Sequence, residues 1–328
     1  MRYFVRSFVF VLSVATLVAA ASAQEKGKAY TDPAKVDEDF ALQGEYSGEV
    51  KTQDGDLKVG AQVIALGDGK FRMVGFHGGL PGDGWDGSDR READGARKGD
   101  RAVFEFDENT VVIEDKKIVV TDGSGSRRGE LKKLERKSPT LGKKPPEGAI
   151  VLFDGKSTNS WQKARMTDNG LLMQGVTSKQ KFGSHSLHIE FRLPYQPAAR
   201  GQQRGNSGSY LQGRYEVQML DSFGLEGKNN ECGGIYTIAE PKVNMCYPPL
   251  TWQTYDIDYT AAEYDGAKKT KNARVTVKHN GVTIHDNVEL THATTAAPLK
   301  EGPEPGPVYL QDHGNPVRFR NIWVVVKK

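Results

Sequence analysis

The segment near the end of the chain, GPVYLQDHGNPVRFRNIW, carries polar side chains within an apolar strand pattern. Alternate residues of a strand share a face, so Val308 and Leu310 would face a core while Tyr309, Gln311 and His313 face the other side. Histidine exchanges protons near neutral pH. An aromatic ring beside hydrogen-bonding groups is how proteins hold sugars, because the ring covers the apolar face of a pyranose. The pattern is therefore compatible with a carbohydrate site that includes a proton-transfer residue.

A second run, RYEVQML, alternates in the same way. Its odd-numbered residues 215–219 are apolar and would join the core, and its polar face consists of Arg214, Glu216 and Gln218. A polar face on an antiparallel strand is also typical of plain solvated surface. The pattern alone leaves both interpretations open for these side chains and for His313.

These residues need strands to position them, and the second half of the chain supplies such runs. HSLHIEFRL, SGSYLQG, QTYDIDYT, ARVTVKH and VTIHDNVEL each alternate over the length of a strand. Asn280 and Gly281 lie between two of the runs, and this pair favours a tight hairpin turn because both residues accept positive φ. No long helical apolar stripe follows the first 23 residues. We therefore expect an all-β fold, with a two-sheet sandwich in the larger domain.

Composition changes along the chain divide it into parts. Residues 24–39 are polar and aperiodic, which predicts a flexible leader. Short alternating runs punctuated by glycine fill residues 40–136 and predict a small β-rich domain of unknown function. Residues 137–147 combine three prolines with basic residues, which predicts a linker before a domain at 148–328.

The first 23 residues have the features of a cleavable signal peptide. Arg2 and Arg6 precede an apolar run that is short for a membrane span, and Ala21 and Ala23 occupy the small-residue positions of a cleavage site. Cleavage would lower the formal net charge from +3 to about +1. The sequence thus predicts a periplasmic or secreted protein without a membrane span after cleavage, and without the basic field that nucleic-acid binding requires.

Export would place the two cysteines, Cys232 and Cys246, in an oxidising compartment. We expect a disulfide between them that contributes on the order of 3 kcal/mol through loop closure. With no third thiol and no paired histidines nearby, a cysteine-based zinc site is not expected.

Several motifs in order carry a family resemblance across residues 148–328. IVLFDGKSTNSW, NSGSYLQGRYEVQMLDSFG, ECGGIY, PPLTWQTYDIDY, ARVTVKHNGVTIHDNVEL and GPVYLQDHGNPVRFRNIW resemble the 3-keto-disaccharide hydrolase domain family. The resemblance implies a concanavalin-like jelly-roll β-sandwich, related in architecture to lectins and laminarinase-type glucanases. A fold alone would not establish a function.

The resemblance also implies a chemistry, the cleavage of glycosides that already carry a ketone at C3. The ketone acidifies the C2 hydrogen, so a base can form an enolate and expel the C1 substituent, after which water adds. His313 is the first candidate for the base or acid, and Glu216 is the second. Arg214, or a divalent metal held by Glu216 and His313, could stabilise the enolate. The residues expected to orient sugar hydroxyls are Gln218, Gln311, Tyr309, Asn206 and Tyr210.

Two other classes of function fit the same strands. A non-catalytic carbohydrate-binding module would use the same aromatic and polar residues without consuming its ligand. A structural module of the cell envelope would need no small ligand. The expected partner is a carbohydrate substrate, and only the enzyme would release a free 3-keto sugar.

Overall fold

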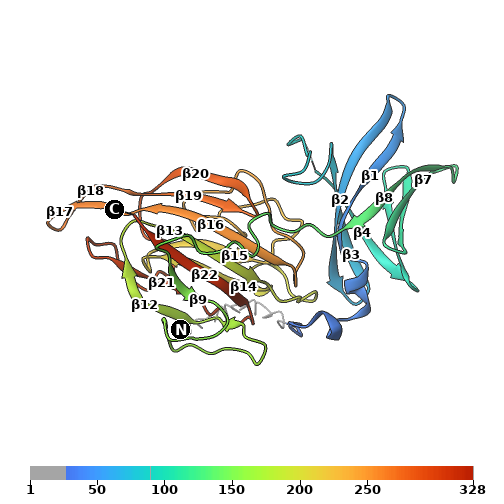
Figure 1. Cartoon of the computed structure of the whole chain (residues 1–328). Coiled ribbons are helices and arrows are strands. Elements are labelled where there is room, and N and C mark those ends of the chain that lie inside the picture. Colours follow the sequence, from blue (N-terminus) through green and yellow to red (C-terminus); the bar gives the residue numbers. More distant parts are fainter. Residues whose placement is uncertain (1–26, 89, 328) are drawn as a thin grey trace, which may run out of the picture.

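The computed structural model describes residues 27–88 and 90–327. The predicted signal peptide, residues 1–23, lies outside them. Figure 1 shows two bodies built of strands, a smaller one from the first half of the chain and a larger one from the second. Helical structure in the described residues is limited to three short 3-10 turns, and none of it is long and apolar enough to reach across a bilayer. The all-β prediction is confirmed.

The smaller body is a closed antiparallel barrel in which each strand pairs with the next and the last pairs with the first. Its strands are β1 (Gly44–Thr52), β2 (Gly55–Gly67), β3 (Lys70–His77), β4 (Arg91–Lys98), β5 (Arg101–Phe106), β6 (Asn109–Glu114), β7 (Lys117–Asp122) and β8 (Arg127–Leu134). Tight turns permit this order: Asp115 and Lys116, between β6 and β7, both have positive φ, as two-residue hairpin turns require. This barrel is the β-rich unit expected at 40–136.

The inward side chains of the barrel form one apolar cluster. Tyr46, Phe71 and Ile113 are fully buried in it, as the inward positions of alternating strands should be. Two residues of the larger body, Tyr195 and Leu250, belong to the same cluster. The two bodies therefore share part of a core.

Residues 27–39 correct one expectation, because the segment predicted as a flexible leader is folded onto the larger body. Tyr30 pairs with Tyr195 through two backbone hydrogen bonds of 2.9 and 3.0 Å. The turns η1 (Pro33–Lys35) and η2 (Glu38–Ala41) are capped by the side chains of Asp32 and Asp37. Capping aspartates satisfy the free N–H groups of such turns, which is why this polar stretch is ordered.

The larger body consists of two sheets and a hairpin. The five-stranded sheet has the order β10 (Trp161–Gln162), β12 (Val176–Phe182), β21 (Gly306–Leu310), β14 (Asn206–Leu211), β15 (Tyr215–Leu220). The seven-stranded sheet has the order β11 (Leu172–Met173), β22 (Arg318–Val326), β13 (His185–Arg192), β16 (Trp252–Thr260), β19 (Ala273–His279), β20 (Val282–Leu290), and β9 (Ile150–Phe153) pairs with β22. The hairpin is β17 (Glu263–Asp265) and β18 (Lys268–Lys271), and the turn η3 (Gly201–Gln203) precedes β14.

The two sheets face each other across a single apolar cluster. Tyr215, Val217 and Met219 of β15 lie in it together with Phe191 of β13 and Ile257 of β16, which confirms the apolar face expected for RYEVQML. Burying such side chains is the main stabilising term of a sandwich. The predicted Asn-Gly turn joins β19 to β20 with φ of 49° and 83°.

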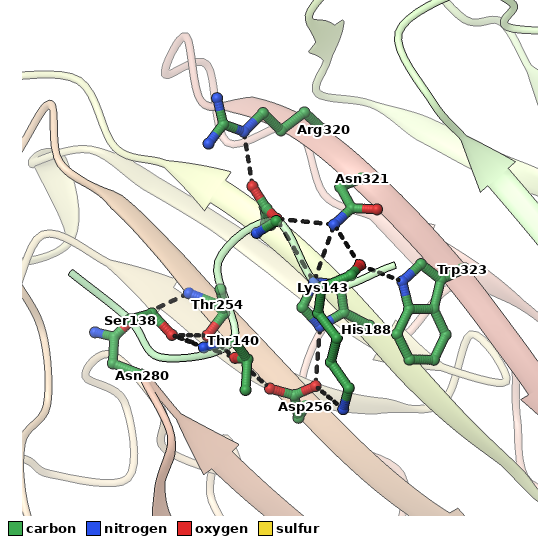
Figure 2. Close-up of polar contacts among 12 residues, drawn as sticks. Ser138, Thr140, Lys143, His188, Thr254, Asp256, Asn280, Arg320, Asn321 and Trp323 are labelled. Carbon is green, nitrogen blue, oxygen red and sulfur yellow. Dashed lines mark hydrogen bonds and ion pairs between the residues drawn. The ribbon is translucent and has the colours of Figure 1, made fainter. Parts of the chain in front are cut away.

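The predicted linker, residues 137–147, is docked against the outer face of the seven-stranded sheet (Figure 2). The hydroxyls of Ser138 and Thr254 are 2.6 Å apart, and Thr140 donates a 2.7 Å hydrogen bond to Asp256. These contacts hold the segment along the strands that it crosses. Residues 137–147, called the strap below, are therefore attached to the larger body.

The two cysteines contact each other as free thiols, and the disulfide between them stays a prediction. Cys232 and Cys246 are both buried and both free in the structure. Each thiol has polar neighbours: the sulfur of Cys232 is 3.3 Å from the Tyr255 hydroxyl, and that of Cys246 donates to the Leu220 carbonyl at 3.5 Å. Burial raises the pKa of the Cys246 thiol well above its ordinary value, so this thiol stays protonated.

Candidate active site

Three neighbouring strands of the five-stranded sheet bring the candidate residues into one row. Tyr210 of β14 is directly opposite Glu216 of β15 on one side and Tyr309 of β21 on the other. Residues that are directly opposite on paired strands share a face of the sheet. This face is the one turned away from the apolar core between the sheets.

Glu216 is the carboxyl of this row and lies on β15, the edge strand of the sheet. It is only 3% exposed, and burial raises its pKa to about 8, although a hydrogen bond with Tyr210 acts in the opposite direction. Loss of hydration disfavours the ionised form of a carboxyl. A carboxyl with such a pKa can take up or release a proton near neutral pH, which is the property of a general acid or base.

Tyr210 connects Glu216 to the end of β21. Its hydroxyl accepts a 3.1 Å hydrogen bond from the amide of Gln311 and donates to the Thr295 carbonyl at 3.3 Å. Its ring is tilted against that of Tyr309, with 5.4 Å between the centroids. Burial, followed by the Glu216 charge, raises the pKa of Tyr210, so the hydroxyl stays protonated as a donor.

A group of amide side chains extends the row along β14 and β15. Asn206 donates to the side chain of Gln202 at 3.0 Å, and Gln218 approaches the same oxygen at 3.4 Å. Asn206 Oδ1 is buried without a hydrogen-bond partner in the described residues. An unpartnered buried acceptor is costly, and a ligand hydroxyl is a group that would satisfy it.

Of the two interpretations of the polar face, plain solvated surface does not hold for the β14 and β15 residues. Glu216, Gln218, Asn206 and Tyr210 are each no more than 3% exposed, because chain segments cover this end of the sheet. The segment at residues 294 and 295 contributes such contacts: the Thr294 hydroxyl accepts a 2.9 Å hydrogen bond from the Glu216 backbone N–H at the sheet edge, and the Thr295 carbonyl accepts one of 3.3 Å from the Tyr210 hydroxyl on the polar face. On the β21 side the residues expected to meet a sugar, Tyr309, Gln311 and His313, are half-buried.

Arg214, immediately before β15, has a different environment. Its guanidinium donates to the Lys300 and Glu304 carbonyls at 2.8 and 2.9 Å and to the side chain of Gln212 at 2.9 Å. These bonds hold the segment before β21 against the sheet. The geometry gives Arg214 an anchoring position, and its predicted role at an enolate stays a prediction.

His313 follows β21 in the loop that leads to β22. The loop is shaped by Asp312, whose carboxylate accepts a 2.8 Å hydrogen bond from Gly314 N–H, as expected for a capping residue. His313 thus lies two residues beyond Gln311, the residue that contacts Tyr210. Its role as base or acid stays a prediction.

A metal site does not emerge from side-chain clustering. Among the described residues no three His, Cys, Asp or Glu side chains gather as ligands of one ion. A divalent ion between Glu216 and His313 stays a prediction.

The sequence interpretation missed Gly208 and Gln202. Gly208 of β14 is opposite Gln218 of β15. Because it has no side chain, it leaves the space that the Glu216 carboxyl occupies. A glycine inside a strand often marks a close approach, and the run NSGSYL carried that signal. Gln202 carried none, because it lies in a turn whose contacts depend on the tertiary structure.

Comparison with protein families gives a clear result. The model of the 3-keto-alpha-glucoside-1,2-lyase-like domain matches residues 148–325, more than half of the chain. The chain belongs to this family. The matched residues include β14, β15 and β21, so the row of candidate residues lies within the family domain.

Solved structures include relatives of this domain. One is the crystal structure of a provisionally assigned glycosyl hydrolase from Parabacteroides distasonis. Its sequence is 34% identical to this one, the match covers 56% of this chain and 85% of that protein's chain, and the TM-score is 0.51. A second such structure from the same organism is 17% identical, covers 56% of this chain and 95% of its own, and has a TM-score of 0.41. Comparison with the curated proteins finds no match. The family and the first structure support an enzyme that acts on glycosides.

Proposed function

We propose that this chain is an exported enzyme that cleaves 3-keto-glycosides, 3-keto-disaccharides among them, by elimination followed by hydration. The observation that carries the proposal is Glu216, a buried carboxyl with a pKa near 8 on the polar face of the family domain. The proposal includes a concanavalin-like jelly-roll arrangement of the two sheets.

The reaction begins with proton removal. The ionised carboxyl of Glu216 takes the C2 proton, and the C–H electrons move toward the ketone oxygen at C3 to give an enolate. To stabilise this charge, the Tyr210 hydroxyl would turn its single proton from the Thr295 carbonyl toward the enolate oxygen. A pKa near the working pH is favourable for such a base.

The bond to the leaving group breaks next. The enolate regenerates the ketone as a C1–C2 double bond forms and the C1–O bond breaks, and the departing oxygen takes a proton from His313. Water then adds, placing a hydroxyl on C1 and a hydrogen on C2. The products are a free 3-keto sugar and the released alcohol or sugar.

The remaining polar residues would orient the sugar. The half-buried ring of Tyr309 offers an apolar surface for a pyranose. Gln311, Gln218 and Asn206 offer amide donors and acceptors for hydroxyls, and the unpartnered Oδ1 of Asn206 is suited to accept one. An unmodified glycoside lacks the acidic C2 hydrogen and should not react.

The direct test is to incubate the purified chain with 3-keto-trehalose and 3-keto-sucrose and to follow the sugars by mass spectrometry. We expect a free 3-keto sugar from the wild type and a rate at least about 100-fold lower for Glu216→Gln. Glu289→Gln, a change in an exposed carboxyl on β20, is the matched control. Intact substrates with saturable binding would instead identify a carbohydrate-binding module.

The route can be tested separately in heavy water. Elimination and hydration would place deuterium at C2 of the product, whereas direct hydrolysis would leave C2 unlabelled. Free 3-keto sugar incubated with Glu216→Gln measures background exchange. Export is proposed because residues 1–23 have the features of a signal peptide. Fractionation of cells that express the full chain tests it.

A further inference from the structure

The barrel is filled at one end and hollow at the other. Tyr46, Phe71, Phe104 and Ile113 close-pack its filled half. The other half contains a cavity of about 490 Å³. Pockets for small molecules are typically about 300 to 1,000 Å³, so this space is large enough for one ligand.

The wall of the cavity is apolar. The aliphatic and aromatic side chains along it include Val50, Leu57, Val59, Met73, Phe106 and Val120. Alternation along the strands explains this, because the inward positions of β1, β2, β3 and β7 remain apolar beyond the filled half. Apolar cavities hold apolar ligands in preference to water.

The two ends of the barrel differ. At the filled end Tyr195 and Leu250 of the larger body join the core. The hollow end is bordered by the β1–β2 and β5–β6 hairpins, with Gln53 and Glu108 in its lining. A ligand would therefore enter from the end opposite Tyr195 and Leu250, while Phe223 of the larger body packs against the outer face of β2 and β3 at the side of the barrel.

Four of the charged residues at the hollow end form two pairs, and Lys51 and Glu108 add one charge of each sign to the lining. Arg91 is 3.1 Å from Asp107, and Arg128 is 2.8 Å from Asp122. Charges that are paired with each other give no net field to attract an ion, but they are suited to meet the polar end of a ligand. The apolar wall and the paired rim together fit an amphiphile.

We propose that the N-terminal barrel is a binding site for an aliphatic amphiphile, whose apolar body occupies the cavity and whose polar end stays at the mouth. Barrels of eight strands are wide enough to hold one small ligand. The binding energy would come from the apolar surface removed from water. This function is separate from the sugar chemistry of the larger body and does not depend on it.

Gly75 provides a way to fill the cavity. It lies in its lining, opposite Ala61 and on the same face of β3 as Met73. A Cβ at Gly75 would meet only the Arg91 carbonyl at 3.8 Å and Phe106 at 3.9 Å, which are ordinary contacts. Gly75→Leu should therefore take up space in the cavity without distorting the strand.

The experiment uses the full chain and the fluorescence of 1-aminoanthracene, an apolar probe. We expect saturable enhancement that decanol reverses and trehalose does not. Gly75→Leu should weaken binding at least tenfold with an unchanged Tm, and Val119→Leu, on the outward side of β7, should bind as the wild type does.

Three outcomes would overturn the proposal. One is the absence of saturable enhancement, and another is displacement by trehalose but not by decanol. The third is unchanged binding in Gly75→Leu. If Gly75→Leu lowers Tm, Val120→Phe, which fills the same cavity from β7, repeats the test.

Discussion

The carboxyl group of Glu216 lies over the backbone of Gly208 on the neighbouring strand. A Cβ on Gly208 would come within 2.0 Å of Oε1 and 2.8 Å of Cδ of Glu216. Gly208→Ala should therefore push the carboxyl out of its position and lower kcat at least tenfold. The stability cost should stay below about 2 kcal/mol, because the displaced group is the end of a side chain.

Ser209→Ala is the matched control for Gly208→Ala. Ser209 is the next residue on β14, and its buried hydroxyl has no hydrogen-bond partner in the described residues. Removing that hydroxyl should leave kcat unchanged and should not lower Tm. Equal activity of Gly208→Ala and the wild type would separate Glu216 from the reaction.

The raised pKa of Glu216 should make stability depend on pH. Its pKa rises from 4.5 to about 8 on folding, so between these values the native state holds the proton more tightly than the unfolded chain. The free energy of unfolding should therefore fall as pH rises through this window. Glu216→Gln should remove this part of the slope, which amounts to a few kcal/mol.

Urea unfolding at pH 5 and at pH 8 measures this effect. The free energies of unfolding of the wild type and Glu216→Gln should differ more at pH 8 than at pH 5, with the variant the more stable at pH 8. The same pH dependence of the free energy of unfolding in both proteins would contradict the shifted pKa. If Glu216 is the base, the wild-type kcat/KM should also rise with an apparent pKa near 8, because only the ionised carboxyl accepts a proton.

Arg214 should behave as an anchor of the segment before β21. Its three hydrogen bonds to Lys300, Glu304 and Gln212 are made in a buried environment. Arg214→Met should therefore lower the free energy of unfolding by about 2 to 4 kcal/mol through unpaired carbonyls. A large loss of kcat at unchanged Tm would instead favour contact with the enolate.

His188 should stabilise the strap in its protonated form. It is 2.9 Å from Asp256 and 3.7 Å from Glu190, and these carboxylates hold Thr140 and Gly142 of the strap. Burial lowers the pKa of His188, but the two carboxylates raise it above its ordinary value overall. Its contribution is therefore fully present below the unfolded pKa of about 6.5 and is lost as pH rises through the folded pKa.

His188→Gln measures this contribution. The variant should lose more stability at pH 5.5 than at pH 9, and limited proteolysis should cut residues 137–147 faster than in the wild type. His77→Gln, a change in an exposed histidine on the barrel, is the control. A pH-independent loss would contradict the protonated form.

Local patterns predicted the strands and their faces, but not what covers them. The alternation in RYEVQML was enough to assign Val217 to the core and Glu216 to the opposite face. The alignment of Tyr309 with Tyr210 depends on the register of strands that are far apart in sequence, which no local pattern encodes. The contacts that residues 294 and 295 make with Glu216 and Tyr210 form only when segments distant in sequence come together, so the burial of Glu216 could not be predicted either.

The same limit explains why the attachment of the connecting segments to the larger body was not predicted. Residues 27–39 and 137–147 lack apolar periodicity, and they are held by hydrogen bonds and caps instead of a hydrophobic face. Asp37 and Thr140 give no sign in the sequence of their partners Tyr195 and Asp256. Polar segments of this kind are predicted as loops, and their attachment appears only in the tertiary structure.

Tyr195 has a consequence for any attempt to divide the protein. Its buried ring belongs to the larger body in sequence but completes the packed end of the barrel. A fragment ending before residue 148 would lose Tyr195 and Leu250 from the packed end of the barrel and would expose the apolar side chains that they cover. The larger body therefore completes the apolar core of the barrel, and deleting it should unfold the barrel or make it aggregate.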